Sequence, residues 1–388
     1  MSHHVTSKQI VWIVPALDFG GVETLCTELA PVLVSRNVQI TVINLGKAGR
    51  AARALAGHGI SVYNLGGSVR PWALSTLYRV YRLLRVLRPS LVHCRVVEAN
   101  WLGGITCVVL GIPFFVEEVG VPRRRSWMGN VLRRGLYARS ARVISVSSAT
   151  HDWLSERGFF SGSSGETRGI TLPNPVDSAK YHRERGAPND RSSASGKHDA
   201  VVIGTVCRLV EEKGIDVLLA SLSSISTDQR AVEVRVVGDG PMREQLETQA
   251  CSLKKKFGQR HMHSPRPFPR VVFCGYREDV PTQLKDLDIF VLPSRTEGVS
   301  LSLLEAMAAG VACVGTTVGD TPRLLAEERG ICVAPDDPVA LAKALNALSQ
   351  DSNLRRSMAS RAERYVRKHH SLETYSEKLL SLYETCAS

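Results

Sequence analysis

The sequence of 388 residues lacks the features of a membrane-spanning or disulfide-stabilised protein. Its longest uncharged stretch, residues 101–116, is interrupted by glycines and a proline and is shorter than the roughly 20 apolar residues of a spanning helix. The apolar run at 10–14 has the length of a strand rather than of a signal peptide. The nine cysteines are scattered singly, so we expect reduced, buried thiols, no zinc or other metal site, and a cytoplasmic location.

Carboxylates are scarce in the first half of the chain. Residues 1–175 hold 20 Lys or Arg against 9 Asp or Glu, which accounts for nearly all of the net charge of +12. No Asp or Glu occurs between Glu28 and Glu98, or between Glu118 and Asp152. Such asymmetry informs about partners rather than about fold. The arginines lack the interleaved aromatics of a groove-reading motif, so we expect no nucleic-acid partner.

Short apolar runs alternate with helical patterns along both halves, which predicts parallel, doubly wound α/β sheets. The strands expected in the first half are 10–15, 38–44, 61–65, 90–94, 113–116 and 142–146, with helices at 22–36, 74–87, 99–110 and 149–157. The strands expected in the second half are 200–206, 233–237, 271–273, 289–292, 312–314 and 330–333. The basic insert 254–270 shows no core pattern and is expected to be an exposed loop.

Polar, Gly- and Ser-rich stretches at 158–169 and 182–199 separate the two halves. We therefore expect two Rossmann-like domains that face each other across a cleft. The first is expected at 1–175 and the second at 176–368. Residues 369–388 contain a final helical stretch.

Two glutamates, Glu297 and Glu305, carry the most informative pattern. A strand and the breaker Pro293-Ser294 precede Glu297, and an apolar helix that contains Glu305 follows Ser300. Both carboxylates can face the carboxyl edge of the sheet, where open α/β sheets bind ligands. The helix N-terminus suits a phosphate, and the carboxylates suit sugar hydroxyls. The pattern favours a sugar-nucleotide site, whereas the simpler alternative is two solvated helix ends.

Two cations follow the first strand of the second half. Arg208 and Lys213 can both reach the expected cleft and neutralise a diphosphate, although pairing with adjacent glutamates in an exposed turn is the alternative. In the first half, the pair Gly20-Gly21 ends a strand and would allow close approach to a phosphate. Gly275-Tyr276 ends another strand, where a backbone amide could meet a nucleobase.

Taken together, these stretches resemble the retaining glycosyltransferases of family 4, which have the GT-B architecture. The matching residues are Gly20-Gly21, Pro173-Asn174 with Asp177, Arg208 with Lys213-Gly214, Gly238 to Pro241, Gly275, Pro293-Ser294 and the segment from Glu297 to Gly310. The resemblance covers nearly the whole chain and is more specific in the second half. It also implies that the first domain lies on the acceptor side and that the second binds the sugar nucleotide. The C-terminal helix of 369–388 would return to the first domain.

The resemblance implies a catalytic site with Arg208 and Lys213 on the diphosphate and Glu297 on the transferred sugar. Glu305 would bind the ribose, and Gly20 and Gly21 would line the donor phosphates. We also expect donor contacts at Gly275, Tyr276, Gly298, Val299 and Ser300. The donor would be a UDP- or GDP-linked sugar, with no further cofactor and no metal, and the acceptor a glycan or a lipid-linked molecule in polysaccharide or glycolipid synthesis. Transfer would retain the anomeric configuration.

Two departures from the family pattern stand out. Residues 115–120 lack the histidine that many members carry near the sugar, so its role is either absent or taken by Glu117, Glu118 or His93. His93 ends a strand, where a core histidine is the alternative. The segment Gly319-Asp320 continues into Thr-Pro-Arg where members often have Gly-Gly-x-Pro-Glu. The missing histidine leaves open a second function, that of a catalytically silent sugar-nucleotide-binding subunit that scaffolds a glycan assembly.

The basic first half also suggests a membrane surface as a partner. Residues 74–88 mix apolar side chains with Arg79, Arg82, Arg85 and Arg88, and a second cluster begins at Arg123, Arg124 and Arg125. An ordinary surface helix is one interpretation. The other is that this basic face docks on anionic lipid or on a lipid-diphosphate acceptor, peripherally on the inner face of the membrane.

Overall fold

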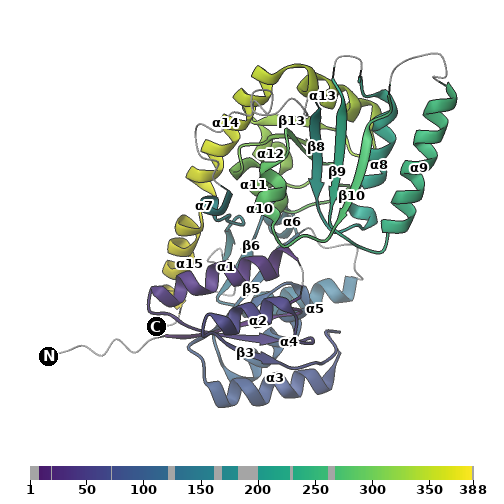
Figure 1. The fold of residues 1–388 in the computed structure, drawn as a ribbon. Helices are drawn as coiled ribbons and strands as arrows, with labels where there is room; N and C mark the ends of the chain where they lie inside the picture. Colours follow the sequence, from purple (N-terminus) through teal and green to yellow (C-terminus); the bar gives the residue numbers. More distant parts are fainter. Residues whose placement is uncertain are drawn as a thin grey trace. The chain divides into compact units, whose positions relative to one another are not determined.

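The computed structural model describes residues 8–18, 20–70, 72–120, 127–160, 168–181, 200–227, 230–260 and 267–386. The chain folds into two compact units, which are coloured along the sequence in Figure 1. Unit 1 comprises Met1–Pro175 together with Leu372–Ser388, and unit 2 comprises Val176–Ser371. Each unit contains one parallel sheet with alternating helices, which confirms the expected pair of Rossmann-like domains.

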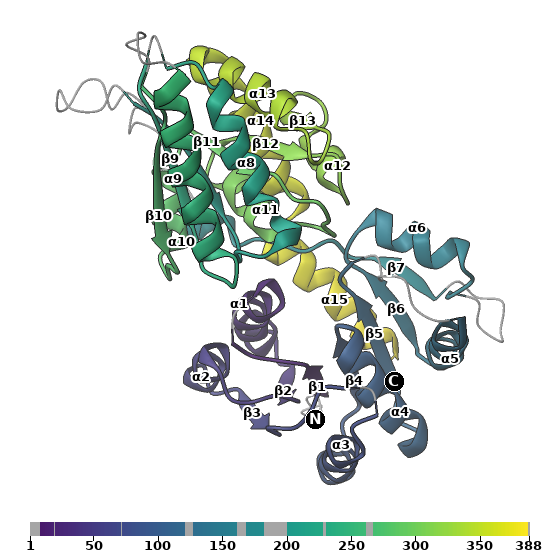
Figure 2. The same ribbon diagram turned by 90° about the vertical axis from the view of Figure 1, so that its right-hand side faces the viewer.

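Unit 1 holds a seven-stranded sheet in the order β3-β2-β1-β4-β5-β6-β7. The strands are β1 (Gln9–Val14), β2 (Gln39–Asn44), β3 (Ser61–Asn64), β4 (Leu91–Arg95), β5 (Phe114–Glu118), β6 (Arg142–Ser145) and β7 (Gly169–Thr171). All neighbours are parallel. Several strands are nearly continuous apolar runs because both faces of the sheet are covered by helices, as Figure 2 shows.

The helices of unit 1 come from both ends of the chain. They are α1 (Gly21–Ser35), α2 (Arg50–Gly57), α3 (Leu74–Leu87), α4 (Val97–Leu110), α5 (Trp127–Tyr137), α6 (Ser148–Glu156) and α15 (Leu372–Cys386). The last of these packs against α1 and adds Tyr375, Leu379 and Tyr383 to a core that contains Trp12. The C-terminal segment is therefore part of the first unit.

Unit 2 holds a six-stranded parallel sheet in the order β10-β9-β8-β11-β12-β13. The strands are β8 (Val201–Val206), β9 (Val232–Val237), β10 (Arg270–Gly275), β11 (Ile289–Leu292), β12 (Ala312–Thr316) and β13 (Gly330–Val333). The α-helices are α7 (Ser178–Tyr181), α8 (Ile215–Ser221), α9 (Arg243–Arg260), α10 (Val280–Lys285), α11 (Leu301–Ala308), α12 (Thr321–Leu325), α13 (Pro338–Gln350) and α14 (Ser352–His369), and 3-10 turns are η1 (Glu211–Lys213) and η2 (Leu222–Ser224).

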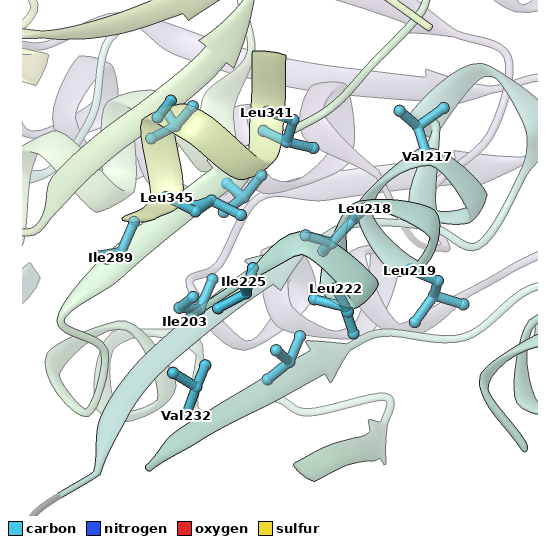
Figure 3. Close-up of a cluster of buried hydrophobic side chains, with 14 of the residues drawn as sticks. Ile203, Val217, Leu218, Leu219, Leu222, Ile225, Val232, Ile289, Leu341 and Leu345 are labelled. Atoms are coloured by element: carbon cyan, nitrogen blue, oxygen red, sulfur yellow. The ribbon is translucent and has the colours of Figure 1, made fainter. Parts of the chain in front are cut away.

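One core of unit 2 lies between its sheet and the helices α8 and α13. Figure 3 shows Ile203 and Ile289 from the strands beside Leu218 of α8 and Leu345 of α13. All four side chains are fully buried. Full burial of such a side chain contributes about 1.5–3 kcal/mol, so this packing fixes the strands whose ends carry the site.

Two expectations need correction. Residues 254–260 are not loop but the last turns of α9. Phe257 is buried and packs on Phe268, which anchors a segment that is otherwise polar or glycine. Cys251 is exposed rather than buried, since it lies on the outer face of the same helix, although all nine cysteines are free thiols. Among the described residues, no helix has both the length and the apolar character needed to cross a membrane.

Candidate active site

The strand order of unit 2 reverses between β8 and β11. In open α/β sheets, ligands bind outside the carboxyl ends of the two strands that flank such a reversal. Arg208 lies two residues beyond β8, and Lys213 ends the short turn η1 that follows. Glu297 lies in the loop after β11. The topology therefore brings the three residues expected to be catalytic to one edge of the sheet.

Lys213 and Glu297 form an ion pair at this edge. Lys213 Nζ lies 2.6 Å from Glu297 Oε1. The hydroxyl of Ser294, which is fully buried, donates to the same carboxylate oxygen at 2.7 Å. No side chain of the described residues bonds Oε2 of Glu297, so this atom can accept a hydrogen bond from a ligand hydroxyl.

Arg208 differs from Lys213 in its surroundings. Its side chain is exposed and has no ion-pair or hydrogen-bond partner within the described part of the chain. A guanidinium is a planar fork that can bind phosphate oxygens in pairs. The carboxyl edge of the sheet thus presents two cations, Arg208 without a side-chain partner among the described residues and Lys213 paired with Glu297.

Two glycines hold the loops of this edge close together. Gly214 has φ of 62°, and a Cβ there would lie 2.0 Å from the carbonyl oxygen of Pro293. Gly319 has φ of 53°, and a Cβ there would lie 2.5 Å from the carbonyl oxygens of Glu297 and Gly298. No other residue fits at either position. The departure from the family pattern beyond Gly319 leaves this contact intact, because Asp320 N–H donates to Gly298 O at 3.0 Å.

Helix α11 begins directly behind the ion pair. Ser300 is its N-cap and accepts a hydrogen bond from Leu303 N–H at 3.4 Å. Val299 is buried, and Gly298 is half-buried beside it. Glu305 lies half-buried on α11 between buried neighbours. The expected donor contacts of this segment thus lie on one short loop and the first turns of one helix, whose N-terminus favours negative charge.

The remaining expected contacts of unit 2 lie at the end of β10. Gly275 has φ of 68°, and its carbonyl accepts from Gly238 N–H at 2.8 Å. A Cβ at Gly238 would lie 1.8 Å from the carbonyl oxygen of Cys207, so the turn after β9 is pressed against the loop after β8. Tyr276 is exposed. An exposed tyrosine ring can stack on a flat ligand.

Unit 1 has its own reversal of strand order, between β1 and β4. Gly20, after β1, has φ of 152° and is the N-cap of α1, whose first residue is Gly21. Burial raises the pKa of Glu23 in the first turn. After β4, Val96 has φ of 73°, a strained conformation for a β-branched residue. Such strain often marks functional sites, and here it lies where the fold predicts a ligand.

A buried polar network lies beneath this edge. Trp12 Nε1 donates to the hydroxyl of Tyr383 at 2.9 Å, and that oxygen lies 2.8 Å from His93 Nδ1. His93 Nε2 lies 3.1 Å from Glu117 Oε2, and Arg95 donates to both oxygens of Glu117 at 3.1 Å. The ionised Glu117 can only accept, so a neutral His93 carries its proton on Nε2, and its bare Nδ1 accepts the hydrogen of the Tyr383 hydroxyl.

The charges of this network explain its pKa values. Burial by itself raises the pKa of Glu117, but Arg95 and His93 outweigh it and bring the value to about 2. Burial lowers the pKa of His93 despite the neighbouring carboxylate. His93 is therefore a neutral core histidine, one of the two interpretations that the sequence left open, and Glu117 is its ionised partner.

Glu118 belongs to a second interior cluster. It accepts a hydrogen bond from the hydroxyl of Tyr137 and lies 3.5 Å from Arg133 Nη1. The Arg133 guanidinium is fully buried and lies 4.6 Å from the ring centre of Phe159. Like Glu117, Glu118 is committed to an interior ion pair, which argues against either carboxylate replacing the family histidine.

Sequence reasoning named Ser294 only as a breaker and a family match, without its bond to Glu297. It missed Arg295 and Asp216, which lie beside the Lys213–Glu297 pair, and the pairing of His93 with Tyr383 and Glu117. A polar residue inside a run that reads as a buried strand, such as His93 in 90–94, was the available signal, because a buried polar group needs a partner.

The chain matches two protein-family models and several known proteins. Residues 19–180 match the family model for glycosyltransferase family 4, and residues 200–351 match that for glycosyl transferases group 1. Glycosyltransferase MJ1607 of Methanocaldococcus jannaschii, itself uncharacterized, is 23% identical over 97% of both chains. An N-acetyl-alpha-D-glucosaminyl L-malate synthase of Bacillus anthracis is 31% identical over 55% of this chain and 52% of its own length.

The fold has close structural counterparts. HepE from Anabaena, solved in complex with UDP, superposes with a TM-score of 0.80 at 20% identity, covering 97% of this chain and 100% of HepE. The match at 19–180 lies almost entirely in unit 1 and the match at 200–351 lies in unit 2, and together they cover most of the chain. The chain therefore belongs to the glycosyltransferases of GT-B architecture and resembles family 4 among them.

Proposed function

We propose that this glycosyltransferase moves a sugar from a nucleotide-diphosphate donor to a glycan or lipid-linked acceptor with retention of anomeric configuration. The observation that carries the proposal is the Lys213–Glu297 pair at the switch point of unit 2, with the unengaged Arg208 on the same edge. Two cations suit the diphosphate, and a carboxylate with one open oxygen suits a sugar hydroxyl. Gly20, Gly21, Gly275 and Tyr276 stay predicted donor contacts.

The residues present suit a leaving-group mechanism. In the proposed step, the bond between the anomeric carbon and the diphosphate oxygen breaks, and the acceptor hydroxyl forms the new bond on the same face of the sugar. The acceptor proton passes to an oxygen of the leaving phosphate. Such a step asks the protein for positioning and for stabilisation of developing negative charge rather than for a strong base. Arg208 and Lys213 would supply that stabilisation.

The choice of donor can be narrowed by experiment. HepE was solved with UDP, which supports starting from uridine donors, and guanosine donors are the second group to test. A thermal-shift panel of nucleotide diphosphates and their sugars would identify the ligand, because binding at 100 times the dissociation constant stabilises by about 2.7 kcal/mol. Turnover of that donor, with the product anomer read by NMR, would test transfer and retention. Binding without turnover would favour the silent scaffold subunit instead.

We further propose that the acceptor side of unit 1 attaches to an anionic membrane surface. Helix α5 buries Arg133 and exposes four large apolar residues, Trp127, Met128, Val131 and Leu132, with Trp127 81% exposed. A helix that turns its apolar stripe to solvent needs a partner for that stripe. Arg123, Arg124 and Arg125 precede it in sequence and lie outside the described residues.

Exposed apolar side chains also occur on α3, where they lie among arginines. Helix α3 packs on α4, and α4 packs on α5. Helix α3 exposes Leu74, Tyr78 and Val86 among the exposed Arg79, Arg82 and Arg85. Exposed apolar and cationic side chains together suit anionic lipid, in which apolar groups insert while arginines meet headgroups. A lipid-linked acceptor would be presented by the same surface.

A further inference from the structure

Arg295, in the loop after β11, connects three loops at the carboxyl edge of unit 2. Its guanidinium donates two parallel hydrogen bonds to Asp216, from Nη1 to Oδ1 at 2.9 Å and from Nη2 to Oδ2 at 2.7 Å. Nη1 also donates to the carbonyl of Glu211 at 2.6 Å, and Nε donates to Asp336 Oδ1 at 2.8 Å. The backbone N–H of Arg295 donates to the carbonyl of Glu212 at 2.8 Å.

These contacts flank both members of the central ion pair. Glu211 and Glu212 immediately precede Lys213 in η1, and Arg295 itself lies two residues before Glu297. The Arg295 side chain thus fixes the backbone that carries the lysine to the backbone that carries the carboxylate. Asp336 lies in the loop after β13, so its hydrogen bond from Arg295 connects that loop to the other two. The backbone of Asp336 is left-handed, with φ of 57°.

The contact set requires an arginine. Only a guanidinium offers a planar fork for Asp216 and further N–H groups for other acceptors at the same time, whereas an ammonium acts as a single point charge. The hydrogen bonds to Asp216, which outweigh the opposing effect of burial, raise the pKa of Arg295, and Asp336 adds to them.

We propose that Arg295 is a positioning residue for sugar transfer, which acts through Asp216 and the carbonyl of Glu211 to set the geometry of Lys213 and Glu297. The inference rests on the proposed function, since it assigns Arg295 to the same site. Arg295 does not touch the donor in this proposal. Its effect on the rate arises because catalysis by orientation is sensitive to displacements of about 1 Å in the groups that hold the substrate.

An ordinary surface ion pair is the alternative. The side chains of Arg295 and Asp216 are 26% and 31% exposed, and single pairs at such positions contribute little to stability. Arg235 provides a matched control, because its side chain is 22% exposed and also pairs with two carboxylates, Glu233 at 2.7 Å and Asp286 at 3.4 Å. Arg235 and Asp286 lie away from the Lys213–Glu297 loops, since Asp286 precedes β11 whereas Glu297 follows it.

The test measures kcat, donor KM and thermal midpoint for Arg295→Ala, Arg295→Lys, Asp216→Ala, the Arg295→Ala/Asp216→Ala double variant and Arg235→Ala. We expect Arg295→Ala to lower kcat at least tenfold with donor KM within threefold. The lysine variant, which keeps one charge toward Asp216, should recover part of that loss. The double variant should lose little more than either single variant, because both changes break one connection. Arg235→Ala should keep kcat within twofold.

Three results would overturn the inference: kcat within twofold of wild type in Arg295→Ala, multiplicative losses in the double variant, or an equal loss of kcat in Arg235→Ala at an equal thermal midpoint. If the wild-type protein itself transfers no sugar from any donor in the panel, the proposed function fails, and the role of Arg295 fails with it. Transfer by the wild type with full transfer by Arg295→Ala removes the positioning role alone.

Discussion

Lys213 Nζ lies 2.6 Å from Glu297 Oε1, although the two residues are 84 positions apart in the chain. The pair joins the loop after β8 to the loop after β11. A donor that binds with its diphosphate beside Lys213 and its sugar beside Glu297 would therefore contact two side chains that are already held at a fixed spacing. Preorganisation of this kind reduces the cost of ordering groups upon binding.

The first prediction concerns the two cations. Arg208→Ala and Lys213→Ala should each lower turnover at least tenfold, which corresponds to about 1.4 kcal/mol of barrier. Each substitution removes a positive side chain that would stabilise the negative charge on the leaving diphosphate. The thermal midpoint should fall only for Lys213→Ala. The Arg208 side chain has no partner to lose among the described residues, whereas loss of Lys213 leaves the Glu297 carboxylate with Ser294 alone. Turnover within twofold of wild type in both variants would remove them from the mechanism.

The second prediction separates the two glutamates by calorimetry. Glu305→Ala should weaken the bare nucleotide diphosphate and the sugar nucleotide alike, because the ribose is common to both. Glu297→Ala should weaken mainly the sugar nucleotide. The loss of one charged hydrogen bond costs roughly 1.5–3 kcal/mol. Equal losses for both ligands in both variants would contradict this division of roles.

The third prediction is that turnover persists in excess chelator, because Arg208 and Lys213 supply the positive charge at the diphosphate. The Asp-x-Asp pair of the chain, Asp286 and Asp288, lies at the amino end of β11, where Asp288 Oδ2 accepts from Val202 N–H at 2.9 Å. Activity that disappears in chelator and returns with added metal would refute the prediction.

The fourth prediction concerns the membrane. The protein should co-sediment with anionic vesicles at low salt and dissociate as salt rises from about 50 to 500 mM, because screening shortens the reach of its arginines. Changing Arg123, Arg124 and Arg125 to Ser should weaken binding. Changing Lys254, Lys255 and Lys256, three exposed cations of α9, to Ser provides a control of equal charge that should have no effect. Equal binding to neutral vesicles would point to an apolar or protein partner instead.

The fifth prediction follows from His93. Its folded pKa is lowered by burial, so below an unfolded pKa of about 6.5 the unfolded chain binds a proton that the folded chain does not, and stability falls as pH drops. Above that pH the group contributes no dependence. Glu117, with a folded pKa of about 2, loses its contribution only below about pH 4.3.

Thermal midpoints at pH 7.5 and 5.5 would check the contribution of His93. The decrease should be smaller in His93→Gln than in the wild type, because the variant has no ring to protonate. His58→Gln offers a control, since His58 is exposed. An identical pH dependence in wild type and His93→Gln would show that His93 is not held neutral.

The sequence predicted the sheet of each unit closely because strands buried on both faces are apolar runs with clear ends. The expected strand at 289–292 and the helix at 74–87 match β11 and α3 without shift. The Glu297 and Lys213 loops could be placed at one edge because parallel strands all end there. Their direct pairing could not be predicted, since it depends on how two loops fold against Gly214 and Gly319.

The missed elements share a physical cause. Helix α5 lacks a regular apolar pattern, because its buried face combines Arg133 with Leu136 and Tyr137 while four large apolar side chains near its start are exposed. Strand β7 has only three residues in a Gly- and Ser-rich region. The contact of Trp12 with Tyr383 spans 371 positions, and no local pattern encodes a bond over that separation.

Helix α15 belongs to unit 1 but is translated after unit 2. The ribosome makes the seven strands of unit 1 first, but Tyr383, which satisfies both Trp12 and His93, leaves the ribosome only after all of unit 2 has been made. Until then the first-made sheet exposes an incomplete interior with polar groups that still face water. The interior of unit 1 can therefore be completed only after unit 2 has been translated.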